Sequence, residues 1–232
     1  MENQLTNFTI DNITNNRNDI INQFGVIEKA IVHSHQRKTK SGKLVQVKEY
    51  EDKRQKKYLN EKTDFNKFKD KEGNIDCHNK NLTSLKGAPK VTEGVFDCDS
   101  NNLTSLKGSP KVIKDYFSCS FNKLTSLEGS PEIVGGDFNC SNNKITSLKG
   151  APKVKGSFGC SENRLTSLEG APKIVKGDFD CANNELTSLK GAPEVVEGNF
   201  ICFGNKVKFT AEDVKKVCKV SGKIYFRPKF PY

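Results

Sequence analysis

Apolar and polar positions between residues 73 and 207 follow one pattern that returns every 20 or 21 residues. Each copy reads F-x-C-x-x-N-x-L-T-S-L-x-G-[AS]-P-x-x-V, and its cysteine marks the period. The seven cysteines are Cys77, Cys98, Cys119, Cys140, Cys160, Cys181 and Cys202. One unit of this length cannot bury its own apolar side, so the pattern predicts a solenoid of seven stacked rungs.

The spacing within the unit predicts which side chains face the core. Apolar residues two positions apart point to the same side of a strand, so the aromatic residue and the cysteine of F-x-C should face inward. The two leucines of L-T-S-L should complete the core. The asparagine three residues after each cysteine suits a sharp bend, and stacked copies would align these amides in a ladder. A Gly-Ala-Pro or Gly-Ser-Pro corner then turns the chain.

This unit resembles the leucine-rich repeat of the short bacterial type, with Phe and Cys in place of two leucines. More narrowly, NNxLTSLEGAP-like units with F-x-C strands are similar to leucine-rich repeat proteins of bacteriophages and their bacterial hosts. The likeness covers about residues 73–232. It implies an α/β, mainly β, leucine-rich repeat solenoid whose short parallel strands line a concave face. It says little about function, because such repeats have many unrelated roles.

Residues 1–72 do not repeat and are expected to form a small α+β unit that anchors the chain. Apolar residues at a 4-3-4 spacing predict a helix over 15–32. The alternating runs 30–38 and 44–50 flank a polar, glycine-containing break at 39–43, which predicts a β-hairpin. A lysine-rich helix or linker follows the hairpin.

The C-terminal segment 208–232 is expected to cap the solenoid. Thr210 and Asp213 resemble a capping box, and the apolar spacing after them predicts a helix over about 211–220. A closing strand is expected at 224–226. No run of the sequence approaches the length of a membrane span, and its first residues lack a secretory signal pattern, so we expect no membrane span and no export.

Charge is unevenly distributed in this chain of net charge +10. The repeats from 73 to 202 hold 15 basic and 15 acidic residues, whereas both ends of the chain are basic. A basic patch falls in 37–57 and includes Arg37, Lys38, Lys40, Lys43, Lys53, Arg54, Lys56 and Lys57. This patch could contact nucleic acid or an acidic protein surface, or it could be a solvated hairpin and helix face.

Candidate chemistry within the chain is sparse. The cysteines are expected to be reduced core residues, with an oxidised pair or a metal site as the alternatives left open. His33 and His35 could share one face of a strand, but a structural role is favoured for them. Neither a catalytic set nor a cofactor motif can be assembled, so we expect no catalytic residues, no metal, no cofactor and no enzymatic activity.

The outward strand positions are the candidate binding site on the concave face. Its residues are Asp76, His78, Asp97, Asp99, Ser118, Ser120, Asn139, Ser141, Asp180, Ile201 and Phe203. The face is small, polar and mildly acidic, with an apolar patch from Ile201 and Phe203.

The favoured hypothesis is a phage-type structural or interaction protein, located in the virion or the bacterial host cytoplasm. Residues 1–72 would attach it to a larger assembly such as a virion, and the repeats would bind or cover a protein. The alternatives are a soluble effector that captures a host defence protein, and contact with a polyanion through 37–57. The sequence leaves the oligomeric state open.

Overall fold

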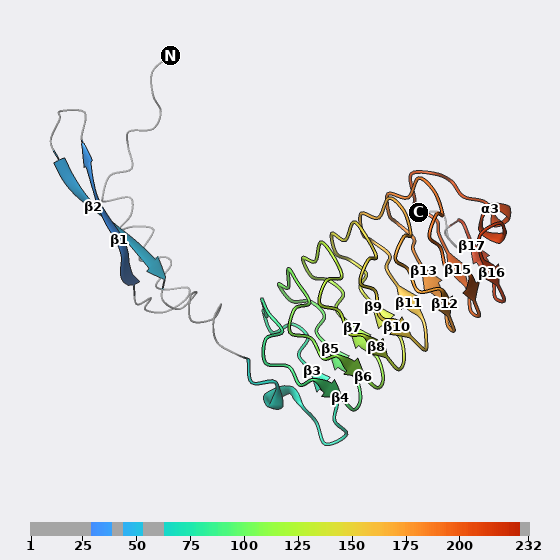
Figure 1. The fold of residues 1–232 in the computed structure, drawn as a ribbon, viewed down its shortest axis with the longest axis horizontal. Helices are drawn as coiled ribbons and strands as arrows, with labels where there is room; N and C mark the ends of the chain where they lie inside the picture. The colour runs from blue at the N-terminus through green and yellow to red at the C-terminus, as the bar shows by residue number, and fades with distance from the viewer. Residues whose placement is uncertain (1–28, 39–43, 53–62, 228–232) are drawn as a thin grey trace, which may run out of the picture. The chain divides into compact units, whose positions relative to one another are not determined.

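The computed structural model describes residues 29–38, 44–52 and 63–227 (Figure 1), and its chain divides into two compact units. The first unit is Met1–Glu61 and the second is Lys62–Tyr232. The seven repeats all belong to the second unit.

The first unit contains the expected β-hairpin. Strand β1 (Lys29–Lys38) pairs with β2 (Leu44–Asp52) in antiparallel register, from Lys29 opposite Asp52 to Lys38 opposite Leu44. The helix expected over 15–32 is wrong at its C-terminal end, because 29–32 belong to β1. Ile31 and Val32 are β-branched residues that favour a strand, and Ile31 pairs with Tyr50. Residues 15–28 lie outside the described residues.

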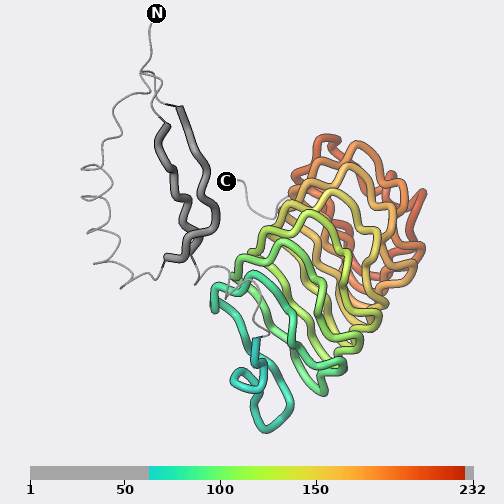
Figure 2. Tube along the Cα trace, turned by 60° about the vertical axis from the view of Figure 1, so that its left-hand side comes forward, coloured from blue at the N-terminus to red at the C-terminus, as the bar shows by residue number. Residues whose placement is uncertain are grey.

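The second unit is a parallel β-solenoid of about seven turns, as the repeat predicted (Figure 2). Each F-x-C segment supplies one short strand to an eight-stranded sheet, called here the first sheet. Its strands are β3 (Ile75–Asp76), β5 (Phe96–Asp97), β7 (Phe117–Ser118), β9 (Phe138–Asn139), β11 (Phe158–Gly159), β13 (Phe179–Asp180), β15 (Phe200–Ile201) and β17 (Ile224–Tyr225). Neighbouring strands pair in exact repeat register, with Phe96 beside Phe117 and Phe117 beside Phe138.

The sequence pattern did not predict a second row of seven strands, six of which follow the Gly-Ala/Ser-Pro corners. The strands are β4 (Val91–Thr92), β6 (Val112–Ile113), β8 (Ile133–Val134), β10 (Lys153–Val154), β12 (Ile174–Val175), β14 (Val195–Val196) and β16 (Lys219–Val220). They form two sheets, β10-β8-β6-β4 and β12-β14-β16. The break between these two sheets lies between β10 and β12. It coincides with the one 20-residue rung, which has one residue fewer than the others between Pro152 and Phe158.

Two columns of side chains fill the space between the sheets. The phenylalanines of the first sheet are buried and stack along the coil, with ring centroids 5.0 Å apart for Phe138 and Phe158 and 5.9 Å apart for Phe158 and Phe179. The repeat cysteines are buried beside them, and the Cys98 thiol donates to the backbone oxygen of Ser118 at 3.0 Å. Burial of these columns supplies the hydrophobic stabilisation that no single rung has alone.

The expected asparagine ladder is present and connects every pair of neighbouring rungs from Asn101 onward. The Asn101 side chain donates to the backbone oxygens of Cys77, Cys98 and Asp99 at 2.9–3.0 Å. Its oxygen accepts from the backbone N–H groups of Lys80 and Leu82 at 3.0 and 2.8 Å. The equivalent residues donate in the same way and accept from the backbone N–H of the first core leucine or isoleucine of the preceding rung; they are Asn122, Asn143, Asn163, Asn184 and Asn205. Each amide therefore satisfies buried backbone groups of two rungs.

The N-terminal end of the solenoid is covered by residues that the sequence pattern assigned to the N-terminal unit. The 3-10 helix η1 (Phe65–Phe68) begins after Asp64, whose carboxylate accepts from the Asn66 N–H. Phe65 is buried and its ring centroid lies 5.8 Å from that of Phe96, so it extends the aromatic column beyond the first rung. Residues 63–72 thus lie in the same compact unit as the repeats, which begins at Lys62.

The C-terminal cap forms much as expected but with a shorter helix. Helix α3 (Ala211–Lys215) carries the predicted capping box between Thr210 and Asp213. The helix does not reach 220, because the Lys219 N–H donates to the Glu194 oxygen and residues 219–220 join β14 as β16. The closing strand is confirmed as β17, which pairs with β15. In the described parts of the chain, no helix is long and apolar enough to cross a bilayer.

We expect Asn101→Ala to lower the free energy of unfolding by about 2–4 kcal/mol, because it leaves several buried backbone groups without a partner. Asn102→Ala is the matched control, since the backbone N–H of Asn102 donates to Leu82 and its side chain has no hydrogen bond within the described residues. Urea unfolding followed by circular dichroism measures both. Equal losses for the two variants would contradict the role given to the ladder.

Thr92→Val should raise the free energy of unfolding by about 1 kcal/mol. Thr92 is buried, and its hydroxyl has no hydrogen-bond partner among the described residues. Val134, Val175 and Val196 occupy the same place in later rungs, so valine fits the site. The same urea experiment tests this expectation, and a destabilised variant would refute it.

Candidate binding face of the first sheet

The candidate site is the outward side of the first sheet, called here the strand face. It consists of the second residue of each strand and the residue two positions later. Asp76 and His78 are exposed at its N-terminal end, and Asp97, Asp99, Asn139, Asp180, Ile201 and Phe203 are partly exposed. The register places Asp76 beside Asp97 and Asp180 beside Ile201. The structure therefore brings these predicted site residues onto one surface.

Three predicted contact residues are too buried to form a contact surface. Ser118, Ser120 and Ser141 have exposed fractions of 0%, 2% and 8%. Their side chains are shorter than those of the neighbouring residues. The Tyr116 side chain, from the adjacent column, forms hydrogen bonds with Ser118 and Asn139. The face is consequently closed at Ser118, Ser120 and Ser141, and its accessible polar groups are Asp76, His78, Asp97, Asp99, Asn139 and Asp180.

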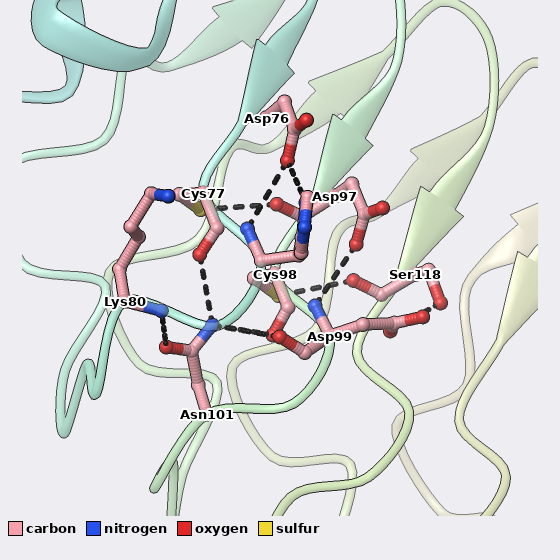
Figure 3. Close-up of polar contacts among 9 residues, drawn as sticks. Asp76, Cys77, Lys80, Asp97, Cys98, Asp99, Asn101 and Ser118 are labelled. Carbon is pink, nitrogen blue, oxygen red and sulfur yellow. Dashed lines mark hydrogen bonds and ion pairs between the residues drawn. The ribbon is translucent and has the colours of Figure 1, made fainter.

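Side-chain oxygens on the strand face also shape the backbone. Asp76, Asp97, Asn139 and Asp180 each accept a hydrogen bond from the N–H two residues later, at 2.9–3.2 Å. This turn follows four strands of the sheet and is made by either Asp or Asn. Ser118 is too short to do the same, so Asp99 of the preceding rung accepts from the Ser120 N–H and from the Ser118 hydroxyl. Asp99 is therefore a structural residue (Figure 3).

The carboxylates on this face are poorly compensated. Burial raises the pKa of Asp180, and the negative charges of Asp178 and Glu162 act in the same direction. Burial also raises the pKa of Asp99, against the hydrogen bond from Ser118, and the charge of Asp97 adds to the rise. Within residues 63–227, neither Asp97, Asp99 nor Asp180 forms an ion pair with a lysine or arginine.

Seven of the eight glutamates in the repeats pair with a lysine of the neighbouring rung, whereas Asp115, Asp137, Glu162 and Asp178 form no ion pair within the described residues. Seven such inter-rung ion pairs occur within residues 63–227, with N–O distances from 2.5 to 3.1 Å. They are Glu93–Lys114, Lys107–Glu128, Lys111–Glu132, Glu169–Lys190, Lys173–Glu194, Lys176–Glu197 and Glu185–Lys206. On the strand face, Asp76 contacts His78, and Asp97, Asp99 and Asp180 have no lysine or arginine partner within the described residues, in a chain whose net charge is +10.

Asp76, His78 and Asp97 form a cluster that the sequence pattern did not assemble. The His78 Nδ1 atom lies 2.5 Å from an Asp76 oxygen, and one ligand atom from each of the three side chains lies within 4.8 Å of the others. Burial opposes ionisation of Asp76, but the hydrogen bonds from His78 prevail and lower its pKa. The sequence contains a signal for this cluster, namely D-x-H at Asp76 and His78 in the first rung and Asp97 in the second rung at the position equivalent to Asp76.

The cysteines point away from this face and offer no reactive thiolate. All eight are free and buried. Burial raises the pKa of Cys77 to about 12, and it raises the pKa of Cys98, Cys119, Cys160 and Cys181 well above the ordinary value. A protonated buried thiol is a weak ligand and nucleophile.

The basic patch lies in the other unit. Arg37 and Lys38 are in β1. Lys40, Lys43, Lys53, Arg54, Lys56 and Lys57 lie outside the described residues, so the patch as a surface stays a prediction.

Comparisons with protein-family models, curated proteins and solved structures give no match for this chain. The repeat architecture is therefore established by the sequence pattern and the structure.

Asp180→Asn should stabilise the protein at pH 7. The raised pKa means that the native state binds the proton more tightly than the unfolded chain, so stability falls as pH rises through that pKa. The penalty is absent below the ordinary value of 3.8 and complete above the raised pKa. Asn139 makes the same turn without a charge, at 3.0 Å to the Ser141 N–H. Asparagine can therefore replace Asp180 without loss of the turn.

Urea unfolding at pH 3 and pH 7 measures this effect. The gain from Asp180→Asn should be present at pH 7 and vanish at pH 3, and the reciprocal variant Asn139→Asp should lose stability at pH 7 only. A gain of equal size at both pH values would show that the charge of Asp180 is not the cause.

Proposed function

We propose that this chain is a non-enzymatic interaction protein whose strand face binds a basic protein surface, while its N-terminal unit attaches it to a larger assembly. The proposal rests on the difference between the paired glutamates of the solenoid and the unpaired aspartates of the strand face. Lysines neutralise glutamates between rungs on the rest of the solenoid, whereas Asp97 and Asp180 have no such partner in the described chain. Arginine or lysine side chains of a partner would supply the missing charge.

The solenoid also supports this role by holding its carboxylates at fixed positions. Backbone hydrogen bonds join each strand of the first sheet to the next, as from Cys77 N–H to Asp97 oxygen at 2.8 Å. The turns at Asp76 and Asp97 restrict both side chains before any partner arrives. A preorganised surface loses less conformational entropy on binding than a flexible one.

Ile201 and Phe203 add an apolar area at the C-terminal end of the same face. Both are partly buried, and Ile201 lies beside Tyr225 of β17. Apolar and aromatic residues supply affinity in most interfaces, while charges set orientation and association rate. A partner with basic residues toward one end and an apolar residue toward the other would match the face.

The resemblance to leucine-rich repeat proteins of bacteriophages favours a more specific proposal, in which the assembly is a virion. Mass spectrometry of purified particles should then detect the chain. Recovery only from the host cytoplasm would favour the effector alternative. Binding of DNA or RNA through the hairpin unit, lost on removal of 37–57 and weakened steeply by salt, would favour the polyanion alternative.

The strand face is tested with an arginine-rich peptide as a model basic partner. We expect the full chain to bind the peptide at low salt, and the triple variant Asp76→Asn, Asp97→Asn, Asp180→Asn to bind about tenfold more weakly. The control carries the same change of charge on the ion-paired surface, as Glu128→Gln, Glu132→Gln and Glu194→Gln. Isothermal titration calorimetry measures the affinity of all three proteins.

An equal loss of affinity in both triple variants would show that only net charge matters. That result would remove the strand face from the proposal. Unchanged affinity in the face variant would remove it as well.

A further inference from the structure

The cluster at the N-terminal end of the strand face has a composition unlike the rest of that face. It joins one imidazole and two carboxylates from neighbouring rungs, with a ligand atom of each within 4.8 Å of the others. Asp76 and Asp97 are register partners on β3 and β5, so two like charges lie directly opposite each other. Such a pair is unfavourable in a sheet unless a cation compensates it. Figure 3 shows both carboxylates on the outward side of the strands.

The fold does not require this pair of charges. The strand-ending turn needs only a side-chain oxygen, and Asn139 provides one without a charge. Ser118, Gly159 and Ile201 occupy the same column and show that the position accepts neutral residues. The two aspartates therefore carry an electrostatic cost that neither turn nor packing demands.

We propose that Asp76, His78 and Asp97 bind a divalent transition-metal ion, with Zn²⁺ as the best match. One nitrogen and two carboxylate oxygens form a mixed donor set that suits zinc and its neighbours in the first row. Calcium and magnesium prefer oxygen ligands alone, so the imidazole argues against them. This site shares Asp76 and Asp97 with the strand face proposed above, so a bound zinc ion and a basic partner would compete for these two carboxylates.

Small side-chain movements would complete the coordination. Ligands about 2.1 Å from a tetrahedral zinc ion lie roughly 3.4 Å from one another. The His78 Nδ1 atom and the Asp76 oxygen, which lie 2.5 Å apart, must therefore separate slightly to admit the ion. The Asp76 and His78 side chains are 62% and 53% exposed, which leaves room for water as a further ligand.

Competing ligands in the chain determine the design of the test. The repeat cysteines are buried and face the opposite side of each strand, so they do not compete while the protein is folded. His33 and His35 occur two residues apart in β1 and could bind an ion by themselves. The experiment therefore uses the full chain with His33→Gln and His35→Gln as its background.

Zinc chloride is titrated into this background protein, and isothermal titration calorimetry should show binding with a stoichiometry of one. We expect His78→Gln and Asp97→Asn each to weaken binding at least tenfold. Asp115→Asn is the charge-matched control, since Asp115 is exposed and lies outside the strand face, and it should leave the affinity unchanged. Co²⁺ substituted for Zn²⁺ should give a visible spectrum without thiolate charge-transfer bands.

Absence of zinc binding, or binding that survives both His78→Gln and Asp97→Asn, would overturn the site. Thiolate bands in the Co²⁺ spectrum would overturn it too, because they would assign the ion to cysteine. Peptide binding is also measured in the presence of a chelator, which removes zinc. Zinc binding and peptide binding are then tested separately, so that the failure of one proposal can be told from the failure of the other.

Discussion

Hydrogen bonding between consecutive rungs is the constraint on which the rest of this solenoid depends. A rung has no packed interior of its own, and its backbone groups at the asparagine bend would be buried without partners. Each asparagine amide joins its own bend to the one before it, as Asn122 joins the oxygens of Cys98 and Cys119. The aromatic and thiol columns can exclude water only when neighbouring rungs hold this register. Core burial and backbone pairing therefore form together or not at all.

Exact stacking places equivalent residues of successive rungs side by side. The electrostatic energy of a charged residue therefore depends on the residues at the same position in the rungs before and after it. On the outer surface, several lysines lie beside a glutamate of the next rung and pair with it, as in Lys111 and Glu132 or Lys173 and Glu194. Pairs so exposed add little stability, but they oppose a shift of one rung against the next. The strand face lacks this pairing with lysine at Asp76 and Asp97. Its charges thus remain available to a ligand.

Much of this architecture could be predicted from the sequence because the repeat has a strict period. The buried columns, the asparagine ladder and the capping box at Thr210 all follow from residue type and spacing. The second row of strands was missed because its inward residue, such as Val134 or Val154, has no second apolar residue two positions away, whereas each F-x-C strand has two. Phe65 was missed as a cap because it lies outside the repeat and completes the aromatic column only in three dimensions. The cluster of Asp76, His78 and Asp97 required the register between two rungs.

The one short rung interrupts strand pairing on one side of the coil but not on the other. Loss of a residue between Pro152 and Phe158 divides the second row of strands, yet β11 still pairs with both β9 and β13 in the first sheet. The first sheet is kept continuous by the asparagine bends on either side, including Asn143 and Asn163. A face that must present groups at constant spacing to a partner needs such continuity. The first sheet provides it over all eight strands, and this is a structural reason to place the binding function there.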